Sequence, residues 1–229
     1  MKKVKKYLIV SPHSDDALLC CSHNLLYPEQ YKVRVLTVEN DEKRVKEDKA
    51  LFDFLQIPYS HLEVDFRDES YYGYKGRYKD MTVESVYKFL REYFGAPKLN
   101  EIEEAIVSWV NDFLSHHDGY TVLAPWGVGH PFHLFVRETI QKTVSYAEYY
   151  RDFFHSFKKR AKPQVERQLE EYRLAKSFPV EEFKDVKWEL AKKFYRSQSS
   201  FLFFEQGYIK KDLAEEVYLR KDDELPFVK

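Results

Sequence analysis

The sequence YLIVSPHSDD at residues 7–16 joins an uninterrupted apolar run to a group of polar side chains. Residues 7–10 are typical of a strand buried on both faces, because such strands carry apolar side chains without alternation. Proline and serine then break the run, and residues 17–26 resume with an apolar pattern that predicts a helix. The stretch therefore predicts a strand, a polar loop and a helix, which is the unit from which α/β sheets are built.

A second stretch, YTVLAPWGVGHPFH at residues 120–133, has the same organisation. Residues 120–124 predict a strand, and Pro131 suits the first turn of a following helix. In a parallel sheet the carboxyl ends of the strands meet at one edge, where ligands bind. We therefore expect the polar loops of the two stretches to lie together, although more than a hundred residues separate them.

The rest of the chain continues the alternation of strands and helices. Strands are expected at 31–38, 60–64 and 216–219, and helices at 43–55, 82–94, 101–115, 164–176 and 187–197. This order predicts a single-domain, Rossmann-like three-layer α/β/α fold with a mostly parallel sheet. Because no repeat or linker interrupts the chain, one domain is expected over 1–229, with a helix-rich part at 145–229 completing it.

The composition fits an enzyme-sized globular domain. Of the 229 residues, 44% are hydrophobic and 17% aromatic, which excludes an intrinsically disordered chain. The net charge of −1 offers no electrostatic basis for binding nucleic acid. No apolar stretch approaches the ~18 residues of a membrane span, and the first apolar run is too short for a signal peptide, so a cytoplasmic protein is expected. The adjacent Cys20 and Cys21 are expected to be buried free thiols.

The two polar loops carry the residue types of a catalytic zinc site. Such a site takes three ligands from His, Asp or Glu and leaves one position for water. His13, Asp16 and His133 supply that set, and Asp15 adds a carboxylate that is available as a general base. His130 adds a proton donor or oxyanion stabiliser. Together these residues suffice for metal-assisted hydrolysis.

Each loop also has an ordinary structural explanation. Two carboxylates after a strand suit the N-cap and first turn of a helix, where they interact favourably with the helix dipole. Two histidines three residues apart at the start of a helix are a weak metal signal on their own. The placement of both groups at the carboxyl ends of strands favours a shared function.

The motifs P-H-x-D-D at 12–16 and H-x-x-H at 130–133 resemble those of the PIG-L/LmbE-like superfamily of zinc-dependent sugar de-N-acetylases. The resemblance implies that His13, Asp16 and His133 are the metal ligands. It further implies that Asp15 is the general base and that His130 stabilises the oxyanion or assists proton transfer. The second motif of the family reads H-x-D-H, so Phe132 stands where the family has an acidic residue.

The implied reaction is removal of an N-acetyl group from a small-molecule amino sugar or sugar conjugate, which releases acetate. Arg44, in a segment that resembles R-x-x-E, and Asp65 are implied as substrate contacts, although a solvated surface role suits both. Zinc is the implied metal, while two histidines and a carboxylate also suit Fe²⁺. Two other functions stay open: an amidase for a non-sugar N-acyl substrate, and, because of Phe132, a relative that binds a glycan without turnover.

Overall fold

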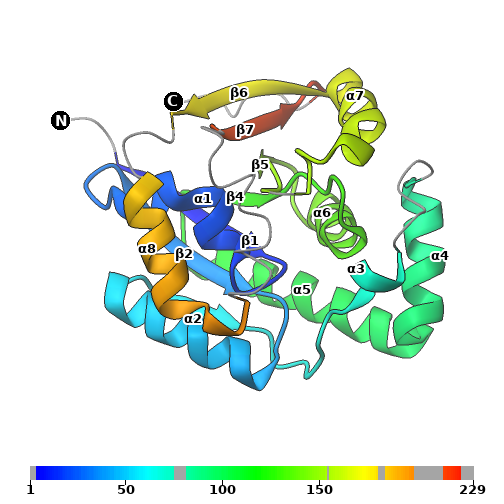
Figure 1. The fold of residues 1–229 in the computed structure, drawn as a ribbon, viewed down its shortest axis with the longest axis horizontal. Coiled ribbons are helices and arrows are strands. Elements are labelled where there is room, and N and C mark those ends of the chain that lie inside the picture. Colours follow the sequence, from blue (N-terminus) through cyan, green and yellow to red (C-terminus); the bar gives the residue numbers. More distant parts are fainter. Residues whose placement is uncertain (1–3, 75–80, 154, 180–183, 199–213, 223–229) are drawn as a thin grey trace.

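The computed structural model describes residues 4–74, 81–153, 155–179, 184–198 and 214–222, which form one seven-stranded sheet with helices on both faces (Figure 1). The strands are β1 (Lys5–Ser11), β2 (Tyr31–Thr37), β3 (Tyr59–His61), β4 (Tyr120–Pro125), β5 (Ala147–Tyr150), β6 (Tyr172–Phe178) and β7 (Glu215–Arg220). Their order is β3-β2-β1-β4-β5-β7-β6, in which the first five strands are parallel and β7 is antiparallel to both of its neighbours. The predicted mostly parallel three-layer fold is confirmed.

The helices divide between the two faces of the sheet. One layer contains α1 (Asp16–Leu26), α2 (Glu42–Leu55) and α8 (Lys184–Phe194), and the other contains α4 (Val83–Phe94), α5 (Ala96–His116) and α6 (Pro131–Thr143). Shorter helices are α3 (Ser70–Gly73) and α7 (Lys162–Glu171), with 3-10 turns at Lys159–Ala161 and Arg196–Gln198. In β1, Tyr7 and Ile9 enter the core of the first layer, while Leu8 and Val10 enter that of the second. This two-sided burial explains the uninterrupted apolar run.

The region after residue 145 differs from the prediction. The helix expected at 164–176 ends at Glu171, and the next seven residues form β6 at the edge of the sheet. Only Tyr172 of this strand is buried, so the alternation that would identify a strand is missing. The described part of this region contains three strands, β5, β6 and β7, beside the helices α7 and α8.

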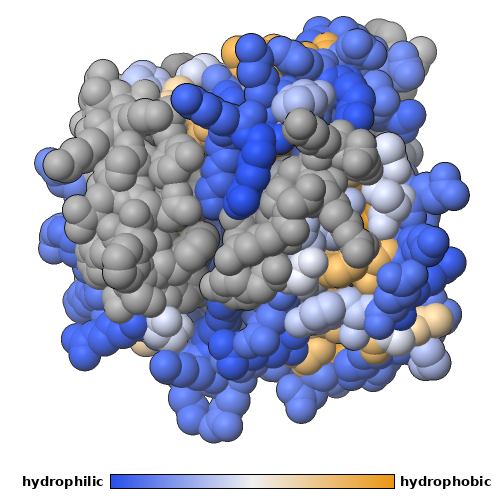
Figure 2. Space-filling view, turned by 45° about the vertical axis from the view of Figure 1, so that its right-hand side comes forward, coloured by the Kyte–Doolittle hydropathy of each residue, from blue (hydrophilic) through white to orange (hydrophobic). Residues whose placement is uncertain are grey.

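The surface is that of a polar protein. The face shown in Figure 2 is mostly hydrophilic in the described residues, with only small apolar areas. Among the described helices none is both long and apolar enough to cross a membrane. Cys20 and Cys21 are buried free thiols, as predicted.

The buried ion pair of Lys187 and Glu215 replaces hydrogen bonds that α1 loses at a kink. The helix is kinked at Cys21, whose φ and ψ are −131° and 25°. The amides of the two following residues donate hydrogen bonds to the Glu215 carboxylate, at 3.1 and 2.9 Å. Lys187 donates to the carbonyl of Leu19 and to Glu215, the latter at 2.8 Å. The pair thus satisfies backbone groups that the kink releases from the helix.

Replacing Lys187 by Met should lower the free energy of unfolding by about 3–5 kcal/mol, because it leaves the buried charge of Glu215 uncompensated. Urea unfolding of Lys187→Met beside wild type measures the loss. Lys192→Met is the matched control on the same helix, and loss of its exposed pair with Glu189 should cost about 0–1 kcal/mol. Equal stability of the two variants would contradict this role.

Candidate metal centre

The candidate site lies where the direction of strand addition reverses. From β1 the chain builds β2 and β3 on one side, and β4 then pairs with β1 on the other side. The loops that follow β1 and β4 consequently face each other at the carboxyl edge of the sheet, the usual place of ligand binding in open α/β sheets. This adjacency brings the two polar loops together, as the sequence predicted.

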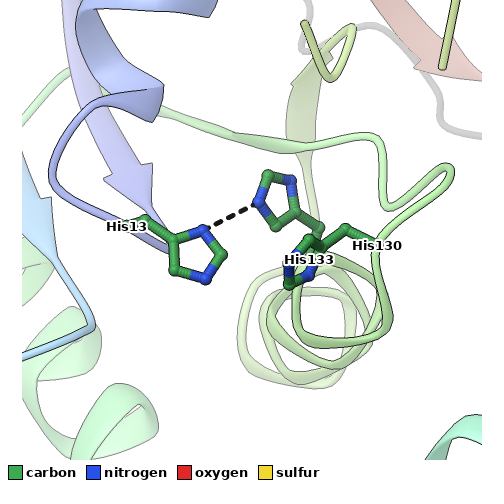
Figure 3. A group of neighbouring side chains, drawn as sticks. All are labelled: His13, His130 and His133. Carbon is green, nitrogen blue, oxygen red and sulfur yellow. Dashed lines mark hydrogen bonds between the residues drawn. The ribbon is translucent and has the colours of Figure 1, made fainter. Parts of the chain in front are cut away.

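Three atoms from the two loops converge on one point. His13 Nδ1 lies 3.0 Å from Asp16 Oδ2 and 3.0 Å from His133 Nε2, and His133 Nε2 lies 3.1 Å from Asp16 Oδ2. All three residues are buried, and Figure 3 shows the rings of His13 and His133 directed toward one another. Ligand atoms bound to one tetrahedral zinc ion at about 2.0–2.2 Å are separated by roughly 3.3–3.6 Å. The donor atoms lie within about half an ångström of this spacing, so a small outward shift of the side chains would accommodate the ion.

A carboxylate fixes the orientation of each of these histidines. His133 Nδ1 lies 2.6 Å from Asp152 Oδ1, and His13 Nε2 lies 2.9 Å from Asp68 Oδ2. Since a carboxylate accepts, we assign the ring proton of each histidine to the nitrogen that faces its carboxylate. The remaining nitrogen lone pairs then point at each other and at Asp16, an arrangement that a cation between them would stabilise.

The charges of the cluster favour positive charge at its centre. Burial lowers the pKa of His133, but Asp16 and Asp152 outweigh it and raise this pKa to about 9. Burial likewise opposes protonation of His13, yet Asp16 and Asp68 hold its pKa well above the ordinary value. Burial raises the pKa of Asp16, but the two histidines lower it well below the ordinary value. Two imidazoles and a carboxylate in these surroundings form a donor set suited to a divalent metal ion.

Asp15 lies beside this donor set at the start of α1. It occupies the N-cap position of α1, but its side chain makes no capping hydrogen bond. Burial and the charge of Asp16 raise its pKa to about 6, while the charge of Arg44 opposes the rise. The N-cap explanation of this carboxylate therefore does not apply. A buried carboxyl with such a pKa suits proton transfer near neutral pH.

His130 faces the cluster from the first turn of α6. Its Nδ1 accepts a hydrogen bond from the Phe132 amide at 3.2 Å, which places the ring proton on Nε2. That Nε2 lies 4.0 Å from Asp68 Oδ2. Burial, followed by the neighbouring His133, holds the pKa of His130 well below its usual value. One donor atom from each of His13, His130 and His133 lies within 4.8 Å of the others, so these three form a second combination of metal donors.

Phe132 belongs to the hydrophobic core. Its ring packs against Phe66 and Phe135, with centroid distances of 5.4 and 5.6 Å, and it has no exposed surface. Its side chain contributes no polar atom to the site. Asp68, from the segment after β3, brings a carboxylate to the His130 side of the cluster instead.

The two expected substrate contacts are placed differently. Arg44 forms an ion pair of 2.5 Å with the buried Glu39, and its charge acts on Asp15. Asp65 is exposed, and no contact described for it reaches the cluster, so its role as a substrate contact stays a prediction. Asp68 is the carboxylate of this segment that reaches the cluster, and its amide donates to Glu39 at 3.0 Å.

The sequence contains a signal that would have distinguished these aspartates. From 62 to 68 the even-numbered residues are buried and the odd-numbered residues exposed. Period-two alternation therefore points Asp68 inward and Asp65 outward. Asp152 and Glu39 had no such signal, because a single carboxylate after a strand predicts nothing about its burial.

No family model matches the chain, and no curated protein matches it either. Among solved structures, it is similar to a deacetylase in the biosynthesis pathway of teicoplanin, with 22% identity and a TM-score of 0.59 over 96% of this chain and all of that chain. A triple mutant of a deacetylase of the same pathway gives 19% identity and a TM-score of 0.59 over the same shares of the two chains. GalB, a 4-carboxy-2-hydroxymuconate hydratase from Pseudomonas putida, superposes less well, with 10% identity and a TM-score of 0.46. At these identities the likeness to the deacetylases shows a shared fold.

Replacing Asp152 by Asn should weaken zinc binding about 10- to 100-fold, because a neutral amide no longer fixes the ring orientation and basicity of His133. Calorimetric titration of metal-free protein with Zn²⁺ measures the effect. Asp112→Asn is the matched control, since Asp112 lies 3.6 Å from His116 in an exposed histidine–aspartate pair. Wild-type zinc affinity in Asp152→Asn would contradict the role of this carboxylate.

Proposed function

We propose that the protein is a metal-dependent hydrolase that removes an N-acetyl group from a small-molecule amino sugar or sugar conjugate. The observation that carries the proposal is the convergence of two histidine lone pairs and the Asp16 carboxylate beside the buried Asp15. The resemblance of motifs 12–16 and 130–133 to zinc-dependent de-N-acetylases supports the same activity. The fold shared with solved deacetylases agrees with it.

The metal ligands in this proposal are His13, Asp16 and His133, the set with mutual donor distances of 3.0–3.1 Å. His130 is not a ligand in this proposal, because its Nδ1 accepts a backbone hydrogen bond and we assign its ring proton to Nε2. When bound, a zinc ion lowers the pKa of water toward neutrality and polarises a carbonyl group. Fe²⁺ is compatible with the same donors.

The residues around the donor set divide the proton transfers between them. Asp15, whose pKa is about 6, is ionised at neutral pH and accepts a proton from the water that attacks the acetamide carbonyl. His130 presents its Nε2–H to the oxygen on which negative charge develops. When the tetrahedral intermediate collapses, the carbon–nitrogen bond breaks and the nitrogen takes up the proton that Asp15 received. The products are acetate and a free amine.

Arg44 is the proposed substrate contact. Its side chain is 22% exposed, and Glu39 fixes one end of its guanidinium group. A guanidinium has five N–H donors, so the group can hold Glu39 and still donate to the hydroxyl oxygens of a sugar. Its position near Asp15 would place those hydroxyls beside the acetamide group.

Zinc-loaded wild type should release acetate from N-acetylglucosamine or its conjugates, whereas Asp15→Asn should retain zinc and lose about 10²- to 10⁴-fold in kcat. The loss is expected because an amide cannot accept the proton of the attacking water. Enzymatic quantification of acetate, with metal content measured in each sample, tests both parts. Asp53→Asn, at an exposed aspartate paired with Lys49, should keep wild-type activity.

The other outcomes distinguish the competing functions. Acetate release from N-acetylated amines but not from amino sugars would assign the site to a non-sugar amidase. Stoichiometric zinc without acetate from either class of substrate would contradict deacetylation and favour a binding protein. Full activity of Asp15→Asn would contradict the assignment of the base.

A further inference from the structure

A second buried polar network lies behind the candidate site and shares no residue with it. Its centre is Asp48 on α2, which is fully buried. The carboxylate accepts hydrogen bonds from Thr37 Oγ1 at 2.7 Å, His61 Nε2 at 3.0 Å and the Tyr195 hydroxyl at 2.7 Å. The donors come from the ends of β2 and β3 and from the residue after α8. The Asp48 carboxylate thus connects the ends of β2, β3 and α8.

Tyr195 connects this network to the loop of the candidate site. Its hydroxyl also lies 2.7 Å from the carbonyl oxygen of Ser14, so its single proton serves two acceptors, Ser14 and Asp48. The Ser14 carbonyl belongs to the peptide bond that leads into Asp15. The hydroxyl therefore holds the peptide plane immediately before the proposed base.

Tyr195 is itself firmly placed. Its side chain has no exposed surface. Two residues later, Ser197 donates from its amide and its hydroxyl to the Glu47 carboxylate, at 2.7 and 2.6 Å. The end of α8 is thus attached to α2 through the consecutive carboxylates Glu47 and Asp48. A tyrosine fixed at both its ring and its following turn can impose its position on a neighbouring loop.

Other contacts hold the metal-ligand side of the loop independently of Tyr195. Ser11 Oγ donates to the His13 carbonyl at 2.6 Å, and the amide of His13 donates to Asp16 Oδ2 at 2.9 Å. Asp68 orients the ring of His13 at 2.9 Å. The donor atoms of His13 and Asp16 therefore do not depend on the Tyr195 hydroxyl. The Asp15 side chain, in contrast, follows directly on the Ser14 carbonyl that Tyr195 contacts.

We propose that Tyr195, backed by Asp48, is a positioning residue that directs the Asp15 carboxylate toward the reacting water. The inference rests on the proposed function, because it assumes that Asp15 is the base. It assigns a role to the C-terminal segment around 195–198. A misplacement of about 1 Å in a catalytic group can cost about 100-fold in rate.

The test is a double-mutant cycle in zinc-loaded protein with N-acetylglucosamine or its best-cleaved conjugate as substrate. Tyr195→Phe removes only the hydroxyl and should lower kcat about 10- to 100-fold, with zinc affinity unchanged and KM within about twofold of wild type. In the Asp15→Asn background the same change should cause no further loss, because the residue it positions is already inactive. Tyr7→Phe is the matched control, since Tyr7 is equally buried and its hydroxyl also contacts a carboxylate, Glu148 at 2.7 Å.

Wild-type kcat in Tyr195→Phe, or an equal loss in the presence and absence of Asp15, would overturn the proposal. A wild type that releases no acetate would instead contradict the proposed function. Amide hydrogen exchange across 11–16 then tests the contact without turnover. Exchange should be faster in Tyr195→Phe than in wild type and Tyr7→Phe, and equal exchange would show that the hydroxyl does not hold the loop.

Discussion

The site depends on one electrostatic constraint. Two imidazole lone pairs and a carboxylate face each other at about 3 Å in a buried place, so positive charge is favoured between them. In water such groups would separate and be hydrated, and burial without a cation would be costly. Here the backbone holds them together, because His13 and Asp16 lie at the end of one central strand and His133 in the helix after its neighbour. The fold therefore provides a place for positive charge.

Other elements surround this centre with further negative charge. Asp68 comes from the segment after β3 and Asp152 from the segment after β5, and each orients one of the histidines. Glu39, at the end of β2, supports both Asp68 and Arg44. The carboxyl ends of the parallel strands β1 to β5 thus all contribute to one site. The order of the sheet, with β1 and β4 at its middle, makes this convergence possible.

The helices on the α1 side connect the C-terminal part of the chain to the same centre. Lys187 and Glu215 replace the hydrogen bonds that α1 loses at its kink. Tyr195 contacts the loop at the start of that helix. In both cases the contact joins residues more than 160 positions apart in the chain, Lys187 with Leu19 and Tyr195 with Ser14. The segment that begins at residue 11 is therefore held from the end of the domain as well as from its own strand.

Local patterns were sufficient to predict the centre of the fold and the approach of its two polar loops. The uninterrupted apolar run of β1, the prolines that end β1 and begin α6, and the polar residues between them are local signals that the structure reproduces. β6 was mistaken for helix because an exposed edge strand lacks a buried face. Asp152 and Glu39 were missed because their roles arise from contacts made at long range by single carboxylates, which leave no periodic pattern. The alternation across 62–68 turns Asp68 inward and Asp65 outward, and Asp68 contacts His13.

A crystal structure of the zinc-loaded protein, with anomalous diffraction recorded at the zinc absorption edge, would show directly whether His13, Asp16 and His133 bind the metal. We expect a single strong anomalous peak about 2.0–2.2 Å from His13 Nδ1, Asp16 Oδ2 and His133 Nε2. His130 Nε2 should stay outside the coordination sphere. A peak coordinated by His13, His130 and His133, or zinc bound only at other residues, would contradict the assignment of the ligands and the mechanism built on it.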